Sequence, residues 1–275
     1  MLIARFDLIS HATIWSPLTS EIRARALNLG VVIARVGMGA FFTSRLEVIR
    51  RSKLYDLFAA MPFIAWLLFV ATQMLPPLRE QIALASFFFF KIHPSALPLS
   101  TALNILSKVC TLAFLSTLVI MFAIRRVPIG RAQGLYPRLV AVAGTFSTVG
   151  IVWLEPQELS PMLYLISLLL MVGGTAFALS AVFALGRSIS LMPEARKLIT
   201  WGPYALVRHP LYVGEMVATA GLAIQFLMPW ALMLLGLSCI LQFERVRHEE
   251  RLLVQALPRY RDYMANTARF IPGVC

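Results

Sequence analysis

Long apolar runs separated by short charged loops dominate the pattern of this 275-residue chain. A bilayer core of about 30 Å requires roughly 20 apolar residues in a helix, and six runs approach that length. They cover residues 57-75, 102-124, 138-154, 161-186, 211-227 and 230-243. Pro229 separates the last two, because proline cannot continue the preceding helix. The pattern predicts an all-α fold: a polytopic membrane helical bundle of about six spans, with a C-terminal helical hairpin and a cytoplasmic tail helix.

Basic residues gather in alternate loops. They precede the first span, join the second to the third, and join the fourth to the hairpin, whereas the loop 154-161 carries Glu155 and Glu158 and no basic residue. Basic loops face the cytoplasm in membrane proteins. The chain is therefore predicted to be a multi-pass integral membrane protein whose loop after residue 187 and C-terminus are both cytoplasmic.

The N-terminal quarter is harder to assign to a span. Residues 26-44 are apolar, but Arg35 would cost about 2.5 to 3.5 kcal/mol at mid-bilayer, which favours a surface-lying or partly inserted helix. The run SFFFFK, 86-91, is too short to cross and is expected to dip into the far interface. Three regions result: an amphipathic or interfacial region 1-55, a membrane-spanning bundle 56-186, and a C-terminal region 187-275 with the hairpin and tail.

Composition supports the membrane assignment. Hydrophobic residues make up 59% of the chain and charged residues 14%, far from the usual soluble balance of about half and a quarter. The net charge of +12 lies in clusters between apolar runs, so it reflects membrane topology and predicts no nucleic-acid partner. The three cysteines are isolated and lack the spacing of metal ligands, so no metal site is expected.

One stretch, WGPYALVRHPLYVGE at 201-215, concentrates polar residues at the start of the hairpin. Gly202 and Pro203 predict a turn, and Pro210 fits the first turn of a helix, where a missing N–H costs nothing. Backbone donors at that helix start, together with Arg208 and His209, could receive an anionic group. Interfacial anchoring by Tyr, Arg and His is the alternative interpretation.

A second polar segment follows the hairpin. In ERVRHEERLL, 244-253, Arg245 and Glu249 are four residues apart and share one face of a helix. A solvated surface pair of little energetic value is the alternative.

Together these motifs resemble the isoprenylcysteine carboxyl methyltransferase family and its phospholipid and thiol methyltransferase relatives. The resemblance rests on LITWGPYALVRHPLYVG at 198-214, ERVRHEERLL at 244-253, Tyr260 and Tyr263, and RFIPG at 269-273. It covers about residues 185 to 273. It implies an S-adenosylmethionine cofactor in a cytoplasm-facing pocket and a lipophilic or lipidated acceptor that reaches the site from membrane lipid.

The resemblance also implies roles for individual residues. Arg245 and Glu249 would be catalytic, with Arg245 on the substrate side. The cofactor contacts would be Arg196, Lys197, Leu198, Ile199, Tyr204, His209, Pro210, Leu211, Tyr212, Glu249 and Glu250.

The acceptor remains open at this stage. Arg245 could orient a carboxylate such as that of a prenylcysteine, whereas a neutral amine or thiol would favour a base, with Glu249, Glu250 or His248 as candidates. Glu215 departs from the family, which commonly has a large aromatic residue there. It is either an interfacial carboxylate that reaches water or a contact for a substrate amine or the cofactor.

Two other classes of function are compatible with an apolar helical chain. An integral-membrane reductase of the sterol reductase type would use NADPH, and a non-catalytic membrane or transport protein would use neither cofactor. The fourth run also carries Gly174 and Ala178 at a spacing of four, which predicts a face where another helix approaches closely.

Overall fold

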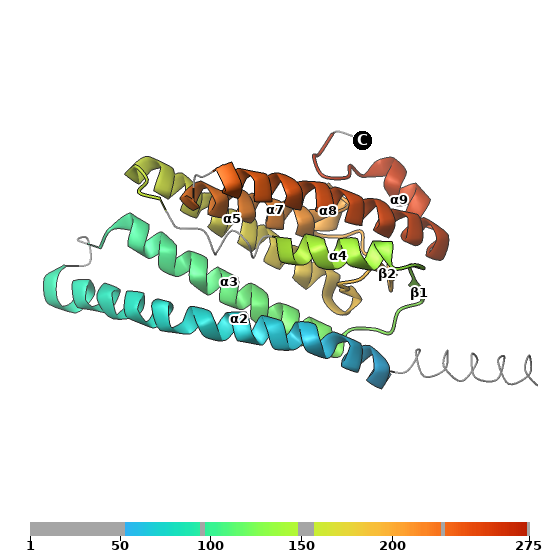
Figure 1. The fold of residues 1–275 in the computed structure, drawn as a ribbon, viewed down its shortest axis with the longest axis horizontal. Coiled ribbons are helices and arrows are strands. Elements are labelled where there is room, and N and C mark those ends of the chain that lie inside the picture. The colour runs from blue at the N-terminus through green and yellow to red at the C-terminus, as the bar shows by residue number, and fades with distance from the viewer. Residues whose placement is uncertain (1–52, 94–96, 148–156, 227–228, 274–275) are drawn as a thin grey trace, which may run out of the picture. The chain divides into compact units, whose positions relative to one another are not determined.

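The structure, a computed structural model, describes residues 53–93, 97–147, 157–226 and 229–273. The prediction for 26-44 therefore lies outside the described residues. Described residues are mainly helical (Figure 1), which confirms the predicted all-α class. Two very short strands, β1 (Gly130–Arg131) and β2 (Glu194–Ala195), pair antiparallel, with Gly130 opposite Ala195.

The first two described helices lie side by side. They are α2 (Lys53–Phe87), which continues into a π-helical turn η1 (Phe88–Ile92), and α3 (Leu99–Ile124). The predicted first span, 57-75, is too short: the helix runs on through Pro76 and Pro77 and includes the SFFFFK run. Proline removes one hydrogen bond but does not stop a helix in apolar surroundings, where the remaining backbone groups must still pair within the helix.

A second group contains α5 (Pro161–Leu185), α7 (Pro210–Phe226) and α8 (Pro229–Ala256). Helices α7 and α8 pack against each other, as the predicted hairpin requires. The predicted break between a hairpin helix ending at 243 and a separate tail helix is wrong, because α8 is continuous over 28 residues. The apolar N-terminal half of α8 and its charged C-terminal half, which carries Arg245 and Glu249, therefore belong to one continuous helix.

The remaining elements are short. Helix α4 (Tyr136–Phe146) packs on α8, and the rest of the predicted span 138-154 lies outside the described residues from 148 on. A 3₁₀ turn η4 (Gly186–Ser188) ends α5, α6 (Pro203–Leu206) precedes α7, and α9 (Tyr260–Asn266) follows α8. The strands and α9 lie at one end of the bundle (Figure 1).

Three of the described helices are long and apolar enough to cross a membrane: Lys53–Ile92, Leu99–Ile124 and Pro161–Ser188. They correspond to the first, second and fourth predicted spans. Helix α7 has 17 residues and α4 has 11, so neither reaches that length on its own. The described residues therefore contain three candidate spans, together with the α7–α8 hairpin.

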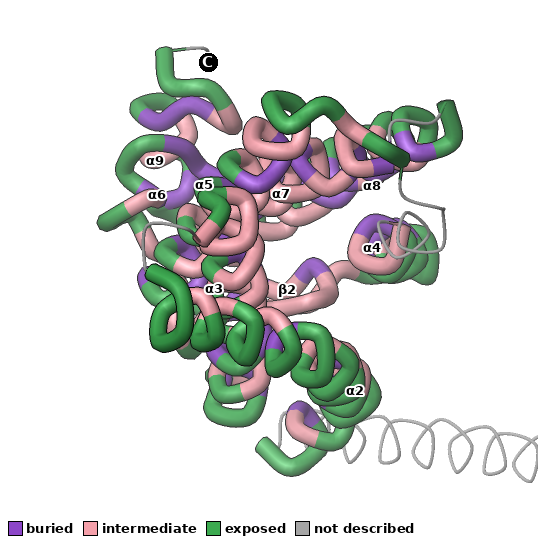
Figure 2. Tube along the Cα trace, turned by 90° about the vertical axis from the view of Figure 1, so that its left-hand side faces the viewer, coloured by how far each residue is buried: buried purple, intermediate pink, exposed green. Residues whose placement is uncertain are grey.

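Burial follows the packing of the helices. Figure 2 shows buried residues where α5, α6, α7 and α8 meet, whereas the outer surface of α2 is largely exposed. Large apolar side chains such as Phe58, Phe69 and Phe87 are exposed on this helix. Exposed side chains of this kind are what a helix facing lipid requires.

Helices α5 and α7 form the most extensive pairing in the described bundle. Added Cβ atoms at Gly174 and Gly214 would lie 2.4 Å from the Ala218 nitrogen and 2.6 Å from the Ala178 nitrogen, respectively. Both contacts are with backbone, so only glycine permits this approach. The small-residue face predicted around Gly174 thus contacts the glycine of the RHPLYVG motif and fixes the start of α7.

Candidate functional site

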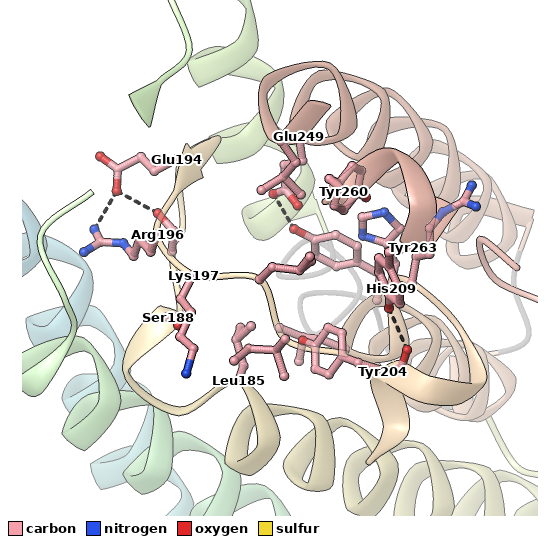
Figure 3. Close-up of a pocket in the computed structure, with 17 residues that line it drawn as sticks. Leu185, Ser188, Glu194, Arg196, Lys197, Tyr204, His209, Glu249, Tyr260 and Tyr263 are labelled. Atoms are coloured by element: carbon pink, nitrogen blue, oxygen red, sulfur yellow. Dashed lines mark hydrogen bonds and ion pairs between the residues drawn. The ribbon is translucent and has the colours of Figure 1, made fainter. Parts of the chain in front are cut away.

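A cavity lies at the end of the bundle where the chain turns from α5 into α7. Its walls come from the end of α5, the loop through β2, the beginning of α7, the charged half of α8 and the helix α9 (Figure 3). The lining residues are Leu185, Ser188, Ser190, Glu194, Arg196, Lys197, Leu198, Ile199, Tyr204, Arg208, His209, Leu211, Tyr212, Glu249, Leu253, Tyr260 and Tyr263. The predicted loop and the predicted tail segment therefore meet around one space.

The loop before α7 is shaped by a glycine turn and by the C-terminal tail. Gly202 has a φ of +62°, a conformation that residues with a side chain rarely adopt, and it starts α6 ahead of Pro203. Beyond α6, the backbone N–H of Arg208 donates to the Ala268 carbonyl at 2.8 Å and that of His209 to the Arg269 carbonyl at 3.2 Å. These two backbone N–H groups are therefore already hydrogen-bonded to the C-terminal tail and are not available to bind an anion.

Glu250 joins the loop and the tail through its carboxylate. Its Oε1 accepts from Arg208 Nε at 2.9 Å and lies 3.2 Å from His209 Nε2, while its Oε2 accepts from Arg269 at 2.6 Å. Burial alone would raise the pKa of Glu250, but hydrogen bonds from His209 and Arg269 and the charge of Arg208 lower it to about 2. Glu250 is thus a buried anion that holds three segments together.

Glu249 lies on the adjacent position of α8 and faces the cavity. Its Oε1 accepts from the Tyr212 hydroxyl at 2.5 Å and from Arg245 Nε at 3.3 Å. Both bonds use one oxygen, and no hydrogen bond to Oε2 is found among the described residues, so Oε2 is available to a ligand. Arg245 itself is 5% exposed and lies over the Tyr212 ring, with 4.9 Å between the guanidinium carbon and the ring centre. Arg245 supports the cavity wall from behind.

Two tyrosines of α9 cover the cavity from the tail. The Tyr263 hydroxyl donates to the Tyr204 carbonyl at 2.6 Å, and burial raises the pKa of Tyr263 to about 12. Tyr260 is 2% exposed, and its buried hydroxyl has no hydrogen-bond partner among the described residues. Burial raises the pKa of Tyr260 as well, so its hydroxyl keeps its proton. An uncompensated buried hydroxyl at a cavity wall is a candidate ligand contact.

Asp56, at the start of α2, is an anchor that sequence reasoning missed. It is 1% exposed and accepts from Arg125 Nε at 2.7 Å and from Arg196 Nη2 at 3.1 Å. Arg196 also donates to Glu194 Oε2 at 2.6 Å. The sequence did show a carboxylate at the start of a long apolar run. It could not show the partners of Asp56, because Arg125 and Arg196 lie 69 and 140 residues away in the chain.

Most of the predicted site residues line the cavity. Those that do are Arg196, Lys197, Leu198, Ile199, Tyr204, His209, Leu211, Tyr212 and Glu249. Pro210 is buried in the first turn of α7, Glu250 is enclosed by its cationic partners, and Arg245 lies behind Tyr212. The cavity also includes Ser188 and Ser190, which carried no motif signal.

Apolar helices and a polar cavity at the end of their bundle define a helical membrane protein with a candidate ligand site. Residues 162–259 match the sequence model of a family described as phospholipid methyltransferase. This match confirms the resemblance to the integral-membrane methyltransferases that include the isoprenylcysteine enzymes. It covers α5, α6, α7 and α8 and ends just before α9, so it contains most of the cavity wall.

Two curated proteins are similar to part of the chain. The nickel-cobalt-cadmium resistance protein NccN of Alcaligenes xylosoxydans xylosoxydans is 35% identical over 80 residues, which are 29% of this chain and 38% of that protein. The cobalt-zinc-cadmium resistance protein CzcN of Cupriavidus metallidurans is 37% identical over 76 residues, 27% of this chain and 35% of that protein. The chain thus spans little more than a third of either relative. No cluster of three or more His, Cys, Asp or Glu residues suited to a metal ion occurs in the described part of the chain.

Proposed function

We propose that the chain is an integral-membrane methyltransferase that uses S-adenosylmethionine and acts on a lipophilic acceptor. The observation that carries this proposal is the meeting of the loop 196–212 with residues 245–250 of α8 around one cavity. The family match over residues 162–259 supports the reaction class.

The groups left free in the cavity fit the donor's chemistry. S-adenosylmethionine carries an ammonium group, ribose hydroxyls and a carboxylate, so its site needs both acceptors and donors. Glu249 Oε2 would accept from the ammonium or ribose groups, and the exposed ammonium of Lys197, for which no ion pair is found among the described residues, would meet the carboxylate. Arg208 is less suited, because its guanidinium already donates to Glu250 and to the carbonyls of Met264 and Thr267.

The apolar part of the wall would hold the rest of the donor. Leu198, Ile199, Leu211 and Leu253 offer apolar surface, and Tyr204 and Tyr260 offer aromatic surface. When bound, S-adenosylmethionine supplies a methyl group on a sulfonium sulfur. The residues of this chain would align the acceptor and exclude water, which together account for much of the rate in such transfers.

In a membrane, the donor and the acceptor would reach the site by different routes. The positive-inside rule puts the cavity end at the cytoplasm, so the polar donor would enter from the cytosol. An amphipathic acceptor need not leave the bilayer and would arrive laterally. The resemblance implies a carboxyl acceptor of the prenylcysteine type, or another lipidic substrate.

Replacing His209 by alanine should weaken donor binding. Its ring lines the cavity and stacks on Tyr212 with 5.7 Å between ring centres, so truncation removes one cavity wall and the polar contact that the ring would make with the donor. The loss of such a contact corresponds to about 10- to 100-fold weaker binding. Calorimetric titration of the detergent-solubilised chain with S-adenosylmethionine measures it.

His248→Ala is the matched control, because that ring lies against Tyr136 and outside the cavity. Equal donor affinity in His209→Ala and the unaltered chain would refute the site assignment. Binding of NADPH in place of S-adenosylmethionine would favour a membrane reductase, and binding of neither would favour a non-catalytic protein. Incubation with labelled donor and a membrane extract would then identify the methylated product.

A further inference from the structure

Glu215 is a carboxylate in an otherwise apolar helix. It is the only Asp, Glu, Lys or Arg in α7, PLYVGEMVATAGLAIQF. Placing an ionisable group within apolar membrane segments is costly, so such residues are retained where they bind or transfer something. Glu215 does not line the donor cavity and is not part of the family motif, so neither explains its presence.

The partner of Glu215 is buried and has an acceptor to spare. Gln242 on α8 is 4% exposed, and its Nε2 donates to Glu215 Oε2 at 3.1 Å. The amide must present its NH₂ group to a carboxylate, because two facing oxygens would repel each other. Gln242 Oε1 is therefore left over, and it is buried without a hydrogen-bond partner among the described residues. It points toward α4, at a place where Gly144 carries no side chain.

Arg245, the neighbouring cation, already uses each of its three guanidinium nitrogens in a contact with the protein. Its Nε donates to Glu249, its Nη1 to the Thr145 hydroxyl at 3.1 Å and its Nη2 to the Leu191 carbonyl at 2.9 Å. A carboxylate acceptor would have to share the guanidinium with these partners. Among the described residues, the cluster between α4, α7 and α8 therefore offers Gln242 Oε1 and the Glu215 carboxylate as acceptors, whereas its cation Arg245 already has protein partners.

We propose that Glu215 and Gln242 bind the head group of the acceptor and select a lipophilic amine over a carboxylate. The inference rests on the proposed function. An ammonium head donates several hydrogen bonds and carries the charge that complements Glu215. Its proton would pass from nitrogen to a Glu215 oxygen, which frees the nitrogen lone pair for methylation. The cluster adjoins the donor cavity through Tyr212, which lines the cavity and supports Arg245.

Three alkyl probes that differ only in the head group test this assignment. The full chain in detergent is given labelled S-adenosylmethionine with dodecylamine, dodecanoic acid or dodecanethiol. We expect methyl label on the amine. Glu215→Gln keeps the side-chain shape and should lower kcat/KM for the amine about tenfold or more, while calorimetric donor affinity stays unchanged. Glu244→Gln, an exposed acid on α8, should change neither quantity.

The outcomes separate this inference from the function on which it rests. Failure of the unaltered chain to bind S-adenosylmethionine would overturn both. Donor binding with label on the acid or the thiol in preference to the amine, or on none of the three probes, would overturn the amine assignment alone. An unchanged kcat/KM for the amine in Glu215→Gln would overturn the role of Glu215.

Discussion

Glu250→Gln should detach the C-terminal tail and lower the free energy of unfolding by about 3 to 5 kcal/mol, the usual cost of removing one partner from a buried ion pair. The carboxylate of Glu250 pairs with two arginines, Arg208 and Arg269, and contacts the His209 ring, and its own side chain is 6% exposed. The neutral amide would leave Arg208 buried with uncompensated charge. Thermal unfolding in detergent and tryptic cleavage after Arg259 and Arg261 measure the loss.

Glu244→Gln is the control for this prediction. Glu244 pairs with Arg247 on the same helix at 2.6 Å, but these side chains are 32% and 55% exposed. Exposed pairs contribute about 1 kcal/mol or less. Equal stability losses in the two variants would show that burial of the Glu250 cluster has been misjudged.

The Glu250 cluster also predicts a dependence on pH. Its pKa is lowered from 4.5 to about 2 in the folded chain. A depressed carboxyl pKa stabilises the fold fully above the ordinary value, and that contribution is lost as pH falls from about 4.5 toward about 2. Hydrogen-exchange protection of the tail amides, taken relative to the intrinsic exchange rate at each pH, should fall over that window in the unaltered chain. Glu250→Gln should lack this step, and persistence of the step in the variant would assign it to another group.

Gly174→Ala should separate α5 from α7 and cost about 3 kcal/mol, the upper end of the usual range for an overpacked core. The new Cβ would lie 2.4 Å from the Ala218 nitrogen, 2.7 Å from the Gly214 carbonyl oxygen and 2.9 Å from the Ala218 Cα. All three are backbone atoms, so no side chain can rotate away. Because Gly214 follows Tyr212 in α7, we also expect weaker S-adenosylmethionine binding, measured by calorimetry alongside the melting temperature.

Gly173→Ala supplies the comparison from the adjacent position. An added Cβ there meets nothing within 4 Å, and alanine is the better helix former by about 1 kcal/mol. This variant should be as stable as the unaltered chain or slightly more so. A Gly174→Ala protein as stable as Gly173→Ala would contradict the close approach of α5 and α7.

The sequence predicted much of the site because its signals are local. Gly202 and Pro203 are neighbours that mark a turn, and Pro210 begins α7 as expected. Nine of the predicted contacts line the cavity because they lie in two short segments with motif spacing. Helix ends were predicted less well. The helix α2 continues through Pro76 and Pro77, and α8 continues past residue 243. Both depend on tertiary packing, which the local count of apolar residues does not include.

What the sequence determined by itself is the apolar helical class, the turn at 202–203 and the residue types available for chemistry, since periodicity, hydropathy and turn preference act over a few residues. Only the tertiary structure decided which of those groups remain free. Arg208, Arg245 and Arg196 all carry charge in the sequence, yet each is already paired with a carboxylate, that of Glu250, Glu249 and Asp56 respectively. Gln242, with no motif, keeps a buried acceptor. These pairings join helices distant in the chain, and they arise because a buried charge is stable only beside a partner that packing brings to it.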